Sequence, residues 1–143
     1  MRQDDVAADF DRIYQELSRR ARHGRFEPNA DVYLSDDRLT LIVTVEVAGA
    51  DPAGLRVGLE ERHLIILGVR HDRERSSRGS VLMKEIEYGQ FLKRIHLPVA
   101  VTYDEAVAAY RDGMLVIRMP VAEPAYVPTS RTEVKITVQR ITV

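Results

Sequence analysis

Residues 108–120 read AAYRDGMLVIRMP, which is the clearest structural pattern in the chain. Asp112 and Gly113 predict a tight turn, because glycine accepts a positive φ without a clash at Cβ. Residues 114–119 predict a strand that is apolar on both faces, and Pro120 ends it because proline cannot donate to a sheet ladder. The stretch therefore indicates a strand–turn–strand unit.

Alternation with a period of two extends outward from this unit. The segment before the turn, 106–110, predicts its partner strand, although its alanines would also suit a helix. Further alternating or compact apolar runs lie at 39–47, 55–59, 64–67 and 91–97. Several short strands separated by turn signals predict an antiparallel β-sandwich. The charged stretch 70–80 predicts a long exposed loop, which runs into a possible short strand at 80–87.

Both ends of the chain differ from this central region. Residues 1–27 predict an N-terminal arm, 28–122 the sandwich and 123–143 a C-terminal extension. In the arm, apolar side chains recur at the helical spacings of three and four, which predicts an amphipathic helix. A short helix with a narrow apolar stripe is marginal alone in water, so it needs a surface to lie against. The stripe consists of Phe10, Ile13, Tyr14 and Leu17.

The extension carries two Ile-x-Val pairs beyond a linker that two prolines keep irregular. Side chains at i and i+2 of an extended strand point the same way, so each pair could fill a groove between edge strands of another subunit. Alternatively the extension is one more strand of its own sandwich. Burying a terminal carboxylate is costly, which favours the first pair. The two pairs are Ile136 with Val138 and Ile141 with Val143.

Composition excludes several classes of function. The 143 residues are 45% apolar and 30% charged, which is typical of a globular domain. A net charge of −1 gives no field that attracts nucleic acid or an anionic membrane. No apolar run is long enough to span a bilayer, no secretory signal is recognisable, and there is no cysteine. We expect a cytoplasmic protein.

No catalytic, cofactor or metal site is expected. The histidines have no metal-ligand spacing, and neither a nucleophile elbow nor a phosphate-binding glycine loop occurs. We therefore expect a protein that is not an enzyme and binds no cofactor. The four histidines are His23, His63, His71 and His96.

A series of short motifs, in order and at compatible spacing, resembles the small heat shock protein family. They are DVY at 31–33, VAGA at 47–50, LIILGVR at 64–70, YGQF at 88–91 and the main motif through Ala108, Gly113 and Leu115. The resemblance implies an alpha-crystallin domain: an all-β, immunoglobulin-like antiparallel β-sandwich with a short helical N-terminal arm and an extended C-terminal tail. The Ile-x-Val pairs resemble the family's tail motif.

The resemblance also implies a function and interaction surfaces. The function is that of an ATP-independent holdase chaperone, which binds unfolding client proteins and assembles from dimers of itself into larger oligomers. The tail-docking groove is implied at Leu55, Val57, Leu59, Ala106, Ala108 and Tyr110. The dimer interface is implied at Ser80, Val81, Leu82, Met83, Lys93 and Arg94, where Lys93 replaces the arginine that is usual in the family.

The apolar stripe of the arm has two interpretations. It could bind hydrophobic surface on a client, or it could pack on a neighbouring arm within an oligomer. For the whole chain, the first alternative function is a non-chaperone interaction domain such as the co-chaperone CS domain. The second is a hydrolase or metal enzyme, which no motif demands.

Overall fold

The chain folds around the hairpin that its sequence predicts. The computed structural model describes residues 3–20, 26–72, 79–122 and 132–138. Strands β6 (Val107–Arg111) and β7 (Met114–Pro120) pair antiparallel. The turn between them has φ of 53° at Asp112 and 80° at Gly113. Two successive positive φ values are those of a type I′ turn, whose twist matches the twist of the strands it joins.

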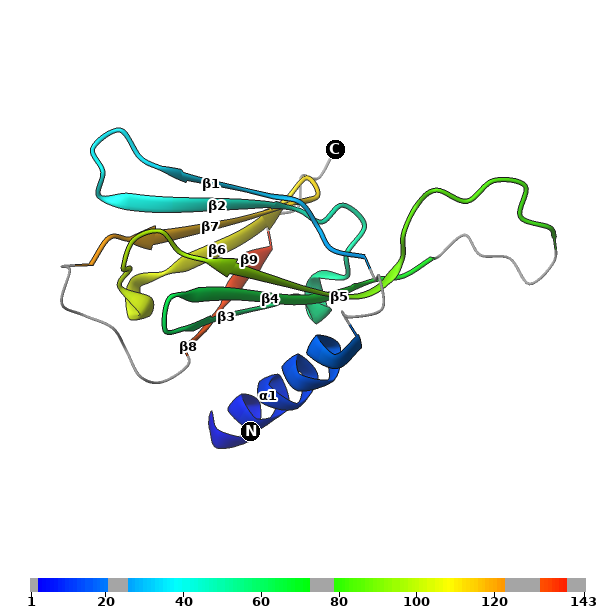
Figure 1. Cartoon of the computed structure of the whole chain (residues 1–143), viewed down its shortest axis with the longest axis horizontal. Helices are drawn as coiled ribbons and strands as arrows, with labels where there is room; N and C mark the ends of the chain where they lie inside the picture. Colours follow the sequence, from blue (N-terminus) through cyan, green and yellow to red (C-terminus); the bar gives the residue numbers. More distant parts are fainter. Residues whose placement is uncertain (1–2, 21–25, 73–78, 123–131, 139–143) are drawn as a thin grey trace.

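The hairpin belongs to one of two sheets (Figure 1). The five-stranded sheet has the order β1-β2-β7-β6-β9, where the further strands are β1 (Ala30–Leu34), β2 (Thr40–Glu46) and β9 (Ile136–Val138). The four-stranded sheet has the order β5-β4-β3-β8, formed by β5 (Gly89–His96), β4 (His63–Arg70), β3 (Arg56–Glu60) and β8 (Thr132–Val134). Two short 3₁₀ turns, Pro52–Gly54 and Tyr103–Glu105, lie in the connections. The β-sandwich predicted from the sequence is confirmed.

The main core lies between the sheets and is built by alternate residues of each strand. In β7, Leu115, Ile117 and Met119 are fully buried, whereas Met114 and Val116 are only half-buried. This strand is thus apolar on both faces but fully buried on one. The segment 106–110, whose alanines would also suit a helix, contributes the strand β6 because its alternation matches the ladder of β7.

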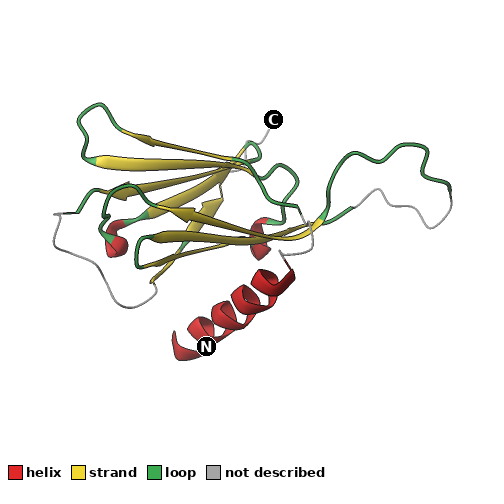
Figure 2. Ribbon diagram, in the orientation of Figure 1, coloured by secondary structure: helices red, strands yellow, loops and turns green. Residues whose placement is uncertain are grey.

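Strand β4 is buried on both faces, which requires a second layer outside the sandwich. Leu64 and Ile66 point into the main core, while Ile65 and Leu67 join a separate cluster with Phe10. Phe10 lies on the amphipathic helix α1 (Gln3–Arg20), which runs along the outer face of the four-stranded sheet (Figures 1 and 2). The arm therefore finds the apolar surface it needs on its own chain. Within the described residues, no helix is long and apolar enough to cross a membrane.

The segment after β4 departs from the sequence prediction. Residues 79–88 form no strand before β5 begins, so the short strand expected at 80–87 is not present in the single chain. This green loop projects away from both sheets (Figure 1). Its apolar side chains are exposed to solvent: Val81 at 71%, Leu82 at 96% and Met83 at 77%. A strand needs a partner for its ladder, and none of the described strands pairs with these residues.

Candidate functional site

The C-terminal tail lies in the groove between the two sheets. Strand β8 pairs antiparallel with β3, with Val134 opposite Val57. Strand β9 pairs in parallel with β6, with Ile136 opposite Ala108 and Val138 opposite Tyr110. The tail thus crosses from one sheet to the other at residue 135 and closes the side of the sandwich between β3 and β6. In the single chain, its own tail fills the groove.

The tail residues are not buried to the same depth. Val134 is 6% exposed and belongs to the main core, Ile136 is half-buried, and Val138 is 37% exposed. Among the described tail residues, 132–138, Val134 is therefore the most deeply buried apolar side chain. The Ile-x-Val pattern did not single it out, although the alternation of Val134 with Ile136 on one side of the strand was a signal for it. The second pair, Ile141 and Val143, lies outside the described residues.

Four of the six expected groove residues pair with the tail: Val57, Leu59, Ala108 and Tyr110. Of these, Val57, Leu59 and Ala108 are buried. Leu55 precedes β3 and is buried in the core, while Ala106 and Tyr110 are half-buried against it. The hydroxyl of Tyr110 donates to the carbonyl of Val47 at 3.3 Å, and burial raises the pKa of that hydroxyl. Tyr110 is thus fixed at the groove wall by its polar end.

The apolar stripe of the arm faces the outer surface of the four-stranded sheet. Phe10 is 1% exposed, and Ile13 and Tyr14 are half-buried around it. Beneath the ring lies Gly58 of β3, where an added Cβ would come within 2.7 Å of Phe10 Cζ. Because only glycine leaves that space, this position fixes where the ring can sit. The side chain of Leu17 lies outside the described residues.

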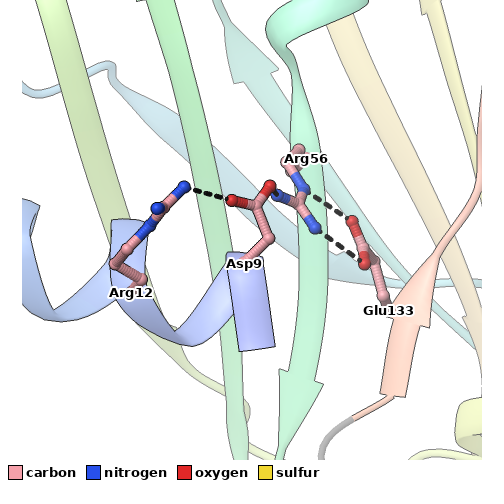
Figure 3. A network of polar contacts seen from close by, with 4 residues as sticks. All are labelled: Asp9, Arg12, Arg56 and Glu133. Atoms are coloured by element: carbon pink, nitrogen blue, oxygen red, sulfur yellow. Dashed lines mark hydrogen bonds and ion pairs between the residues drawn. The ribbon is translucent and has the colours of Figure 1, made fainter. Parts of the chain in front are cut away.

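One arginine contacts both terminal segments (Figure 3). Arg56 of β3 donates from Nε and Nη2 to the two carboxylate oxygens of Glu133 on β8, at 2.8 and 3.1 Å. Its Nη1 donates to Asp9 Oδ2 on α1 at 2.8 Å, and Asp9 also pairs with Arg12. The guanidinium lies 5.3 Å from the centroid of the Phe10 ring. The hydrogen bond to Glu133 is the largest cause of a raised pKa at Arg56, so the cation persists at every working pH.

Replacing Arg56 by glutamine should loosen the arm and the tail together. The side chain of Arg56 is 18% exposed and its bonds are charge-assisted, so each contact is expected to contribute about 1 kcal/mol. Amide hydrogen exchange should accelerate by roughly fivefold in both 3–20 and 132–138. Glu133→Gln, the matched control, should accelerate exchange in 132–138 alone. Faster exchange in only one segment of the Arg56→Gln variant would contradict this shared role.

The residues implied in a dimer interface lie on two different elements. Ser80 to Met83 belong to the projecting loop, whereas Lys93 and Arg94 lie on β5, an edge strand of its sheet. Lys93 Nζ contacts Glu27 Oε1 at 3.2 Å. In the five-stranded sheet the corresponding edge strand is β1, which exposes Tyr33 at 50%. The chain thus offers an exposed apolar segment and an open strand edge at separate places.

A pair of histidines lies across β4 and β5, with ring centroids 5.1 Å apart. Burial, followed by the charges of Arg94 and His96, lowers the pKa of His63 from 6.5. No three potential metal-ligating side chains converge anywhere in the described part of the chain.

Acidification should therefore destabilise the fold through His63. A histidine whose pKa is lower in the folded state binds a proton more readily once unfolded. Its contribution is complete above the unfolded pKa, near 6.5, and is lost as the pH falls. The free energy of unfolding should drop between pH 7.5 and pH 5.5, and His63→Gln should reduce that drop. An identical drop in both proteins would exclude His63 as its source.

Comparison with known proteins agrees with this architecture. The sequence model of the Hsp20/alpha crystallin family matches residues 34–139. A probable 15 kDa heat shock protein of Leptospira interrogans is 24% identical over 123 residues, covering 86% of this chain and 89% of that protein. The 18 kDa heat shock protein of Streptomyces albus is 27% identical over 124 residues, covering 85% and 84%. The crystal structure of hspA from Xanthomonas axonopodis superimposes with a TM-score of 0.62 at 26% identity, covering 71% of this chain and 100% of that one. With the hairpin motif, the sandwich and the tail in place, this chain belongs to the Hsp20/alpha crystallin family of small heat shock proteins.

Proposed function

We propose that the protein is an ATP-independent holdase chaperone, which acts in the cytoplasm and has no enzymatic activity. One observation carries the proposal: two apolar surfaces of the sandwich are covered by terminal segments of the chain. The arm covers Ile65 and Leu67 on the outer sheet face, and the tail covers the groove beside Val57 and Ala108. The family relationship supports a chaperone role.

The covering segments are held weakly enough to be released. Helix α1 has 18 residues, and its described apolar contacts with the sheet are those of Phe10, Ile13 and Tyr14. An isolated helix of this length is marginal in water. The tail strands β8 and β9 have three residues each. Heating that detaches either segment exposes apolar surface, which can then bind the exposed apolar surface of an unfolding client and keep it from aggregating.

If the tail of one subunit bound the groove of another, the apolar groove would stay covered within an assembly. Ile136 lies 16 positions after Pro120, so the tail reaches at most about 50 Å and can enter the groove of a neighbouring subunit. The contacts made there would be the ones that the tail makes with its own groove. The exposed loop at Ser80 to Met83 would pair with the open edge of β1 in a second copy, completing the strand that the single chain lacks.

The test is heat-induced aggregation of a generic client followed by light scattering, with no nucleotide present. We expect the protein to suppress scattering at near-equimolar subunits, and added ATP to change nothing. A folded sample, shown by circular dichroism, that leaves client scattering unchanged would contradict holdase activity. Suppression that requires ATP would contradict the proposed mechanism.

A further inference from the structure

The neighbouring residues Asp9 and Phe10 occupy a site with two parts on the outer sheet face. The ring of Phe10 lies over Gly58 and against the side chains of Ile65 and Leu67. The carboxylate of Asp9 accepts from Arg56 Nη1 at 2.8 Å. A carboxylate and the aromatic ring that follows it in sequence are thus held at the same time. We call the receiving surface the Gly58 site, formed by Arg56, Gly58, Ile65, Leu67 and Leu92.

The two parts of the Gly58 site accept different groups: Gly58 leaves room for an aromatic ring, and Arg56 binds a carboxylate. At Gly58 an added Cβ would lie 2.7 Å from Phe10 Cζ and 3.2 Å from both Cε atoms, so the missing side chain makes room for a flat ring. A glycine within a strand weakens it, and close approach by another group is a reason to keep one there. Arg56 is mostly buried and is held by its bidentate bonds to Glu133. One guanidinium edge therefore stays fixed toward an incoming carboxylate.

We propose that the Gly58 site is a binding site for an acidic–aromatic pair on an unfolding polypeptide, and that α1 occupies it as an intramolecular substitute. The proposal rests on the proposed holdase function and names the feature of a client that is recognised. The recognised client segment carries an Asp or Glu followed directly by Phe, and it can form a helical turn. Release of α1 would then free the Gly58 site and the apolar stripe of the arm in one event.

Many client segments could bind this site, because binding requires only one aromatic ring and one carboxylate. The structure shows one ring and one carboxylate in the two parts of the site, with Ile13 and Tyr14 only half-buried beside them. A tethered occupant has an effective concentration in the millimolar range, so α1 excludes weak external ligands until it detaches. Binding of a client segment at the Gly58 site would therefore increase with temperature, because heating detaches the marginal helix α1.

The test uses fluorescence anisotropy of labelled peptides with the full-length Phe10→Ala chain, in which the ring part of the site is empty and Asp9 alone competes for Arg56. The probe is an alanine-rich helical peptide with one Asp-Phe pair, compared with its Asn-Phe and Asp-Ala forms. We expect the Asp-Phe peptide to bind at least tenfold more tightly than either form, and wild-type chain to bind it at least tenfold more weakly than Phe10→Ala. Adding Gly58→Val to Phe10→Ala should abolish binding. Adding Val107→Ala, on an exposed position of the other sheet, should change nothing.

Two further comparisons keep the test decisive. Because Gly58→Val could disturb β3, Arg56→Gln with Phe10→Ala provides a second variant: it should weaken the Asp-Phe peptide roughly tenfold and leave the Asn-Phe peptide unchanged. A peptide of residues 3–20 represents the arm of a second copy. If this arm peptide binds and the Asp-Phe peptide does not, the site accepts another subunit rather than a client, and the proposal is overturned. Equal binding by folded chains with and without Gly58→Val also overturns it. Client suppression is measured separately, so persisting suppression with no peptide binding defeats this site and leaves the holdase function standing.

Discussion

Replacing Val134 and Ile136 together by alanine should release the tail and, if the proposed exchange between copies occurs, shrink the resulting assembly. Val134 is buried opposite Val57, and Ile136 is half-buried opposite Ala108. Removing their outer carbons loses about 3 kcal/mol of apolar burial, which is roughly a 150-fold weaker contact. Multi-angle light scattering at physiological temperature should show a mass close to that of a dimer.

Val138→Ala is the matched control for this prediction. Val138 lies in the same tail and in register with Tyr110, but it is 37% exposed. Its truncation should weaken the contact by less than about 1 kcal/mol and leave the assembly mass nearly unchanged. A double variant with the wild-type mass would show that the tail does not set assembly size. A Val138→Ala variant that dissociates fully would show that the exposed end of the tail makes a different contact from the one seen in the single chain.

Gly68→Ala should destabilise the sandwich strongly. Gly68 lies in β4 and faces the main core, where an added Cβ would come within 2.3 Å of Phe91 Cζ and 2.9 Å of Leu55 Cδ2. Neither neighbour can move without disturbing packed side chains. We expect a loss of about 3 kcal/mol and a fall in Tm of roughly 10 °C, measured by denaturant and thermal unfolding.

Gly58→Ala tests the same chemical change on the other face of the same sheet. Its added Cβ would collide with Phe10, which belongs to the arm rather than to the main core. The ring can leave with α1, so the unfolding of the sandwich should change by less than about 1 kcal/mol. Amide exchange in residues 3–20 should accelerate well beyond that of wild type. Equal losses of stability in the two variants would show that the arm is an integral part of the cooperative unit.

The parts of the fold that depend on local patterns could be predicted from the sequence. The Asp112-Gly113 turn follows from the backbone freedom of glycine, and the strands follow from alternation, because each needs only neighbouring residues. The amphipathic arm was predicted for the same reason, with its stripe through Phe10. The pattern could not say which surface the stripe would meet. That depends on Gly58, which lies 48 residues away and reads in the sequence as an ordinary strand glycine.

In the tail, too, features that depend on neighbouring residues could be predicted, whereas features that depend on distant residues could not. The Ile136 and Val138 pair predicted a strand that could dock, and two of the groove residues named from the family resemblance, Ala108 and Tyr110, lie opposite it. Burial of Val134 could not be derived from alternation alone, because it depends on how the tail crosses between the sheets. The hydrogen bonds between Arg56 and Glu133 could not be derived from the sequence either, because these residues are 77 positions apart. The strand expected at 80–87 failed to form for a related reason: strand-like residues still need to pair with a strand edge, and no described strand of the same chain pairs with them.

In the proposed function, release of the arm exposes the client-binding surface. The most direct measurement is amide hydrogen exchange in residues 3–20, followed over a temperature series in which suppression of client aggregation is also recorded. We predict that α1 loses protection at the temperature where suppression begins, while β2 and β7 remain protected. Full suppression while α1 is still protected would contradict the account, as would loss of α1 protection with no suppression of aggregation.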